Sequence, residues 1–187
     1  MMKTIKIFFI LSWFLFAFQP VKLTKTKIGK SITVSLPDIF ILMTQSEVHS
    51  KYVSAREPLA SYSDETRNVD FSVNVAFSKW NASDLELMKS FYKSNIMGLY
   101  DEVHFIQEKI EEINGRSFAV FEFISTIRTE SDVPGSANSI GRYTYIQYTI
   151  INGKTVLFNF SCPTRLKDKW APIAEEIMNS VKVKDSL

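Results

Sequence analysis

The sequence has little of the chemistry that most enzymes use. Its 187 residues include one cysteine and two histidines. Because Cys162 has no cysteine partner, no disulfide can form within the chain even in an oxidising compartment. Phosphate-binding glycine loops, G-x-S-x-G elbows and H-E-x-x-H motifs are all missing. These absences argue against nucleotide-dependent enzymes, serine hydrolases of the α/β type and zinc peptidases.

The two histidines do not predict a metal centre. His104 shares a strand face with Glu102, and Glu108 lies further along the same strand. A metal site needs three or four convergent ligands, and a further ligand would have to come from His49, far away in the sequence. A partly exposed histidine beside carboxylates on a sheet face explains this pattern better, so we predict no metal site and no cofactor.

Neither the cysteine nor the glutamates predict a catalytic residue. Cys162 follows an apolar strand, and Pro163 after it removes the amide donor that an oxyanion hole would use. We therefore expect a small buried hydrophobe at Cys162. Glu108, Glu111 and Glu112 could hide a glycosidase-like pair, but with Lys109 among them they are typical of a solvated hairpin tip. We predict that the protein is not an enzyme.

The first residues predict export. Two lysines in Met1–Lys6 precede an apolar run of twelve residues, Ile7–Phe18, interrupted only by Ser12. A bilayer span takes roughly 20 residues, so the run suits a signal peptide over residues 1–19, with no integral span in the mature chain. Gln19 is a poor residue before a cleavage site, so an uncleaved anchor remains an alternative. The expected location is periplasmic or secreted.

Net charge gives no reason to expect nucleic acid as a partner. Removing Lys3 and Lys6 from the 22 basic residues leaves 20, which balance the 20 acidic residues. A chain of zero net charge is not drawn to nucleic acid or to an anionic membrane by its overall charge. The partner is therefore expected to be a protein or a small molecule.

Two Asn-Gly pairs predict the centre of the fold. Asn114-Gly115 and Asn152-Gly153 each join two runs rich in β-branched and aromatic residues, which is a strong signal of a type I′ hairpin. The strand returning from the first turn, Arg116–Arg128, is apolar on both faces, with Glu122 as its one charge. A strand of this kind belongs to a sheet that is covered on both sides.

Other elements are indicated by alternation and by capping patterns. Strands are expected at Lys22–Lys30, Ser31–Leu36, Pro58–Ser63 and Asp70–Ser78. Thr44 with Glu47, and Ser83 with Glu86, have the spacing of capping boxes and predict a short helix to about Tyr52 and a longer one ending near Gly98. A last helix should begin near Lys169, because Pro172 is tolerated only close to a helix start. One domain over residues 22–187 accounts for all these elements.

Local residues resemble those of the PsbP-like superfamily, which also includes Mog-type Ran-binding proteins and DcrB-type periplasmic proteins. The resemblance is carried by SITVSLPDIF, RSFAVFEF, YTIINGKTVLFNFSCP and IMNSVKV, which are residues 31–40, 116–123, 148–163 and 177–183. It implies an α+β fold in which a single antiparallel sheet is covered by helices on both faces. It also implies a non-enzymatic role, and no functional motif carries over residue by residue.

The expected function is that of an exported, non-enzymatic binding or accessory domain. The candidate interaction surface joins the polar loop Glu130–Gly141 to the strand after it, since Tyr143 and Tyr145 share a face and tyrosine is favoured at interfaces. Packing of these tyrosines under a helix is the competing interpretation. The complete candidate set is Ser131, Asp132, Asn138, Tyr143 and Tyr145. The alternative function is a carrier of a small apolar ligand, held between sheet and helices in a pocket lined by Phe121, Phe123, Phe158 and Phe160.

Overall fold

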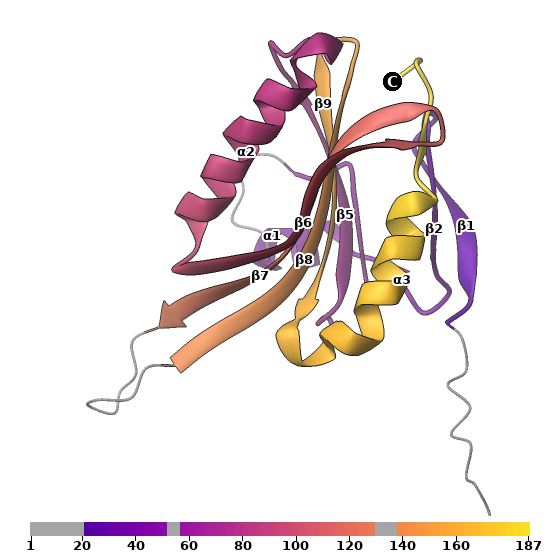
Figure 1. Ribbon diagram of the computed structural model, residues 1–187. Helices are drawn as coiled ribbons and strands as arrows, with labels where there is room; N and C mark the ends of the chain where they lie inside the picture. Colours follow the sequence, from indigo (N-terminus) through magenta and orange to yellow (C-terminus); the bar gives the residue numbers. More distant parts are fainter. Residues whose placement is uncertain (1–20, 52–56, 130–137) are drawn as a thin grey trace, which may run out of the picture.

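The computed structural model describes residues 21–51, 57–129 and 138–187. Two antiparallel sheets and three α-helices make up this part of the chain (Figure 1). The strands are β1 (Leu23–Ile28), β2 (Ile32–Pro37), β3 (Ile41–Leu42), β4 (Ala60–Ser63), β5 (Asp70–Phe77), β6 (Glu102–Ile113), β7 (Arg116–Thr129), β8 (Asn138–Ile151), β9 (Lys154–Pro163) and β10 (Lys182–Val183). The helices are α1 (Gln45–Lys51), α2 (Leu85–Leu99) and α3 (Lys167–Asn179), with 3₁₀ turns at Ala82–Asp84 and Thr164–Leu166.

The larger sheet has the strand order β3-β4-β5-β9-β8-β7-β6. Both predicted hairpins are confirmed, because Ile113 pairs with Arg116 and Ile151 with Lys154 across two-residue turns. The turn asparagines Asn114 and Asn152 have φ of 52° and 49°, the left-handed region that an Asn-Gly turn requires. Four long strands in direct succession therefore form one half of this sheet.

The prediction of a single sheet is wrong. β2 pairs with β1 and β10 in a separate three-stranded sheet, of order β1-β2-β10. The predicted alternation in β2 is present, because Ile32, Val34 and Leu36 are buried. These side chains pack on the core, but the backbone of β2 does not pair with any strand of the larger sheet. In Figure 1, α3 and β2 lie on one side of the larger sheet.

Helices cover both faces of the larger sheet, as predicted from β7. Phe118 and Val120 belong to the core under α3 and the small sheet, while Ala119, Phe121 and Phe123 belong to the core under α2. α3 contributes Trp170, Ala174, Ile177 and Met178 to the first core; α2 contributes Leu85, Met88 and Ile96 to the second. Alternate residues of one strand thus build two separate hydrophobic cores.

The capping predictions had different outcomes. At α1, the Thr44 amide donates to Glu47 Oε2 at 2.7 Å and the Glu47 amide donates to Thr44 Oγ1 at 3.3 Å, which is a capping box. Before α2, the pair in use is Asn81 and Asp84, whose carboxylate accepts from the Asn81 amide at 2.7 Å. The Ser83–Glu86 box was wrong because a 3₁₀ turn precedes the helix and moves its start to Leu85.

Two boundaries also differ from prediction. β8 begins at Asn138, and Asn138 to Gly141 pair with Thr126 to Thr129, so the predicted loop is partly strand. α3 begins at Lys167, two residues before the predicted Lys169, because the 3₁₀ turn at Thr164–Leu166 leads directly into it. Among the described residues, no helix combines the length and hydropathy needed to cross a bilayer.

Candidate functional site

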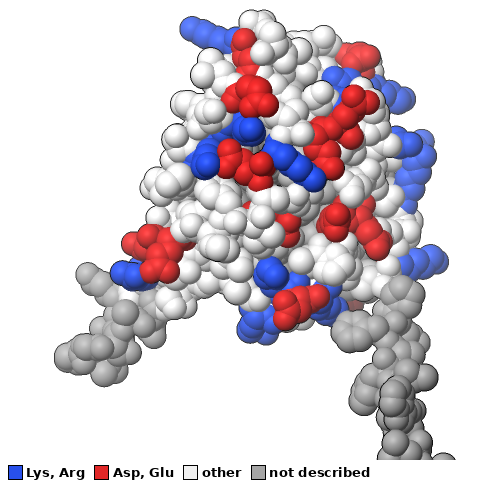
Figure 2. Space-filling view, viewed as in Figure 1, with Lys and Arg blue, Asp and Glu red and all other residues white. Residues whose placement is uncertain are grey.

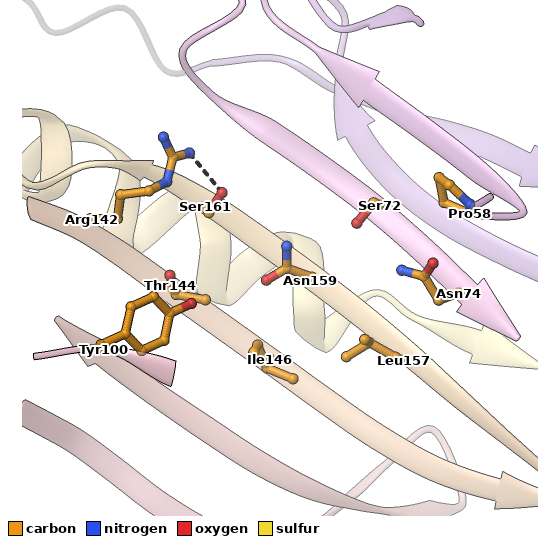
Figure 3. A pocket seen from close by; sticks show the side chains of 10 residues that line it. All are labelled: Pro58, Ser72, Asn74, Tyr100, Arg142, Thr144, Ile146, Leu157, Asn159 and Ser161. Atoms are coloured by element: carbon orange, nitrogen blue, oxygen red, sulfur yellow. Dashed lines mark hydrogen bonds between the residues drawn. The ribbon is translucent and has the colours of Figure 1, made fainter. Parts of the chain in front are cut away.

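A polar groove lies on the same face of the larger sheet as α2, because Ile146 and Leu157 of its lining also pack against the core under α2. Figure 3 shows the groove from close by. Its volume is about 370 Å³, which is near the lower end for small-molecule sites. Neighbouring strands β5, β9 and β8 form its floor, and each contributes alternate residues. The floor residues are Ser72, Asn74, Arg142, Thr144, Ile146, Leu157, Asn159 and Ser161, with Tyr100 and Pro58 at the sides.

The floor is polar because of strand register. Ser72 pairs with Asn159 across β5 and β9, and Thr144 pairs with Ser161 across β8 and β9. Residues opposite each other in an antiparallel ladder point to the same face, so these side chains form adjacent rows. The opposite face of the same strands carries Phe71, Phe158 and Phe160, which are fully buried. One face of the three strands therefore builds the core and the other builds the groove.

Asn74 and Asn159 carry the open side-chain amides of the groove. Both are half-buried, and neither side-chain amide has a hydrogen-bond partner among the described residues. Each amide offers two N–H donors and a carbonyl acceptor. Figure 3 shows Asn159 on β9 between Thr144 and Ser72, with Asn74 further along β5. The two amides can therefore pair with a ligand that has both donors and acceptors.

A buried carboxylate holds the charged end of the groove. Asp70 is 1 % exposed, and its Oδ1 accepts from Lys51 Nζ at 2.6 Å and from the Ser63 hydroxyl at 2.7 Å. Arg142 Nη2 lies 3.5 Å from the other oxygen, Oδ2, and donates to Ser161 Oγ at 2.8 Å. Two cations against one anion leave a net positive charge at this end. Asp70 thereby fixes the Arg142 guanidinium where it lines the groove.

The sequence-predicted tyrosines are not part of this site. Tyr143 and Tyr145 are 0 % and 2 % exposed and belong to the core on the α3 side. The Tyr143 hydroxyl donates to Glu122 Oε1 at 2.7 Å. The pKa of Tyr143 is raised far above its ordinary value, mainly by burial and next by the hydrogen bond to this carboxylate. Packing under a helix, the competing interpretation, is what the structure shows. Neither ring is accessible to a partner.

The remaining residues of the predicted surface belong to the Glu130–Gly141 loop. Ser131 and Asp132 lie outside the described residues, and Asn138 is described only as the first residue of β8. The next residues of that strand are placed: Ile140 is exposed, and Arg142 lines the groove two residues before the buried Thr144. The groove thus uses the same strand as the predicted surface, but through residues of the opposite face.

Residues considered for catalysis or metal binding are dispersed. Cys162 is fully buried, and burial raises the pKa of its thiol to about 11. His104 is exposed on β6, and His49 Nε2 contacts Glu57 Oε1 at 2.8 Å in another part of the molecule. Within the described ranges, no three His, Cys, Asp or Glu side chains gather as a metal ion would require.

The predicted phenylalanine-lined pocket is wrong. Phe121 and Phe123 lie in the core under α2, whereas Phe158 and Phe160 lie in the core on the other face of the sheet. Four rings divided between two faces cannot line one cavity. A hollow of about 520 Å³ does lie beside α2, and its lining includes Tyr92, Leu99 and Tyr148.

Comparison with known proteins identifies the fold. No family model and no curated protein matches the chain. Cyanobacterial PsbP (CyanoP) from Synechocystis sp. PCC 6803 is similar in structure, with a TM-score of 0.57 and 14 % identity over 90 % of this chain and 96 % of that chain. The Ran-binding protein Mog1p of Saccharomyces cerevisiae has a TM-score of 0.57 and 13 % identity, covering 89 % and 97 %. LpqN, involved in cell envelope biogenesis of Mycobacterium tuberculosis, has a TM-score of 0.55 and 9 % identity, over 89 % of this chain and 92 % of that chain.

These similarities define an α+β protein with mainly antiparallel sheets and helices on both faces of the larger one. The fold is like that of CyanoP and Mog1p, which is the fold that the resemblance in local residues predicted. At 9–14 % identity the likeness concerns fold alone, and folds of this kind do not fix a function. The function must be argued from the groove.

Proposed function

We propose that the protein is a non-enzymatic binding or accessory domain that holds a polar ligand or chain segment in the groove over β5, β9 and β8. The single observation that carries the proposal is the pair of unsatisfied amides, Asn74 and Asn159, in a hollow with the positive charge of Arg142 at one end. Both amides reach the solvent of the groove, so a ligand with complementary donors and acceptors can pair with them in place of water.

The lining of the groove supports binding over catalysis. None of its ten residues is a carboxylate, a histidine or a cysteine, the usual groups for general acid–base or nucleophilic catalysis. The Arg142 guanidinium remains protonated at any physiological pH and donates without accepting a proton. The Tyr100 hydroxyl is thus the one lining group that could transfer a proton, and no carboxylate, histidine or cysteine stands beside it in the lining, which favours recognition over catalysis.

An accessory role in the cell envelope is the setting that we propose. The apolar run Ile7–Phe18 after two lysines supports export, and one protein of the same fold, LpqN, is involved in cell envelope biogenesis. Fractionation of the source cells followed by mass determination of the mature N-terminus tests the export step. Recovery of the intact chain in the cytoplasm would overturn it.

Affinity capture with a point variant tests the groove. The immobilised protein and its Asn159→Ala variant are exposed to the same envelope extract, and the bound material is identified by mass spectrometry. We expect the variant to lose a captured species, because one lost hydrogen bond to a neutral partner costs about 1 kcal/mol and weakens binding about fivefold. Asn179→Ala is the control, since Asn179 is exposed at the end of α3, on the opposite side of the sheet. Equal capture by all three proteins would contradict the proposal.

A further inference from the structure

The outer face of the small sheet is unusually rich in lysine. Lys25 and Lys27 lie on β1 and Lys182 on β10, and all three are exposed. Lys22, Lys30 and Lys184 flank them and are exposed as well. None of these six lysines forms an ion pair with a described residue. We call this set the lysine face.

Strand register places these charges on one side. Thr33 on β2 pairs with Lys27 on β1 and with Lys182 on β10, so the three side chains form one row across the sheet. Lys25 lies opposite Ser35 in the next row on the same outer face. Cross-strand neighbours on one face have Cβ atoms about 5 Å apart. The short hydroxyl side chains lie between the lysines, so the ammonium groups project furthest from the surface.

Nearby carboxylates do not neutralise this face. The Asp185 carboxylate is paired with Arg116. Asp38 contacts Lys22 through the backbone, where the Asp38 amide donates to the Lys22 carbonyl oxygen, and not through its carboxylate. In Figure 2, blue side chains project along the right-hand edge, where Figure 1 places β1, whereas red and blue are mixed over the front of the molecule. The near-zero net charge of the chain without its first residues thus conceals a local concentration of one sign.

We propose that the lysine face binds the anionic headgroups of a lipid bilayer. Lysine is a compact, strongly hydrated point charge, which suits a diffuse negative surface, whereas arginine suits bidentate recognition of single groups. Each lysine near an anionic membrane contributes about 1 kcal/mol. The apolar run Ile7–Phe18 ends four residues before Lys22 in the sequence, so an uncleaved run would hold β1 at the membrane, whereas after cleavage the lysine face alone supplies the attraction.

Protection of sheet edges does not explain the arrangement by itself. β1 and β10 are both edge strands, and lysines on edges discourage pairing with another chain. That role would be met by charges on either face of the strands. Here Lys25, Lys27 and Lys182 share the outer face with Thr33 and Ser35 between them, so their ammonium groups can meet one anionic surface together.

Vesicle co-sedimentation of the full chain tests the proposal. Binding is measured to vesicles of phosphatidylcholine alone and to vesicles containing phosphatidylglycerol, at low and high salt. The difference between the two compositions isolates the charge-dependent part from any contribution of the apolar run. For Lys25→Gln/Lys27→Gln/Lys182→Gln we expect this part to fall on the order of 100-fold, since each lysine accounts for about a fivefold change.

A second triple variant provides the matched control. Lys89, Lys93 and Lys109 are already paired with Glu86, Glu108 and Glu111 at 2.6–2.9 Å, and they lie on α2 and β6. Their replacement by Gln changes the net charge equally, and we expect a loss of less than fivefold. Equal losses in both variants, or no dependence on phosphatidylglycerol, would overturn the proposal. Lysine-face-dependent binding of a DNA oligonucleotide without vesicle binding would also overturn it. None of these outcomes bears on the groove.

Discussion

The side-chain amide of Asn114 donates a hydrogen bond to the carbonyl oxygen of Val181 at 2.9 Å, and a second to that of Asn179 at 3.0 Å. The residue that makes the first hairpin turn therefore also holds the end of α3. Asn152, in the corresponding position of the second hairpin, donates to the carbonyl oxygen of Asp185 at 2.6 Å. Both turn asparagines thus bind the segment that leads into and out of β10.

Replacement of Asn114 by Gly should separate these two roles. Glycine keeps the positive φ of the turn but removes the amide, so we expect Asn114→Gly to lower the free energy of unfolding by about 1–2 kcal/mol. Asn114→Ala should cost about 1 kcal/mol more, because alanine is strained at φ of 52°. Urea denaturation measures both variants. If Asn114→Gly matches the unmodified protein, the contacts to α3 contribute nothing.

The Asp70 cluster should show strong coupling between its members. Lys51 and Asp70 side chains are 25 % and 2 % exposed, and removal of one partner leaves a buried charge. We expect Lys51→Met to destabilise the fold by about 3 kcal/mol. In the double variant Lys51→Met/Asp70→Asn the loss should be at least about 1 kcal/mol smaller than the sum of the single losses. If the stability losses of the two single variants simply add up in the double variant, the Lys51–Asp70 ion pair does not stabilise the fold.

Cys162 should be unreactive in the folded protein. It is 0 % exposed, and burial raises the pKa of its thiol to about 11, so at pH 8 only about one thiol in a thousand is ionised. We expect labelling by a thiol reagent to proceed only as fast as the protein unfolds. Concentrated guanidinium should expose the thiol and restore full labelling. Rapid labelling without denaturant would show that the core around β9 opens locally.

The carboxylate of Asp64, in the turn between β4 and β5, should make the stability of the fold depend on pH in the acidic range. Burial raises the pKa of Asp64, but hydrogen bonds from the Thr66 hydroxyl and from the Val69 and Asn68 amides outweigh burial and lower it below the usual 3.8. A carboxyl group with a lowered pKa in the folded state stabilises the fold above its unfolded pKa and loses this effect as the pH falls through the folded value. The stability difference between the protein and Asp64→Asn should therefore be largest above about pH 5 and shrink below pH 4. A stability difference that stays constant across this pH range would show that the Asp64 carboxylate does not contribute to stability.

Local patterns predicted what depends on local chemistry. The Asn-Gly turns, the Thr44–Glu47 cap and the two apolar faces of β7 were recognisable because turn conformation, capping and alternation depend on residues close in sequence. The Ser83–Glu86 pattern failed because Asn81 and Asp84, two residues earlier in the chain, make the capping contact instead. Ser83–Glu86 fits the usual Ser/Thr-x-x-Glu/Gln pattern better than Asn81–Asp84 does, so the pattern alone favoured the wrong pair.

The groove and the second sheet could not be predicted in the same way. Asp70 reads as a solvent-facing residue of β5, and its partners Lys51 and Arg142 lie 19 and 72 residues away. The alternation in β2 indicates which face is buried but not which strands pair with its edges. A usable signal was present: Ser72 with Asn74, Thr144, and Asn159 with Ser161 make three strands polar on one face. Their register, however, is set by the tertiary fold.

The position of β2 has a consequence for biosynthesis. The Ser35 amide donates to the Ser180 hydroxyl at 2.8 Å across 145 residues of chain, and β10 completes the sheet that β1 and β2 begin. During synthesis, Ile32, Val34 and Leu36 therefore leave the ribosome long before α3 and β10 exist to cover them. Pairings of such long range form late, and apolar strands exposed in the meantime are sites of aggregation. Chains truncated before Lys167 should accordingly depend on chaperones, even though both long hairpins are already complete.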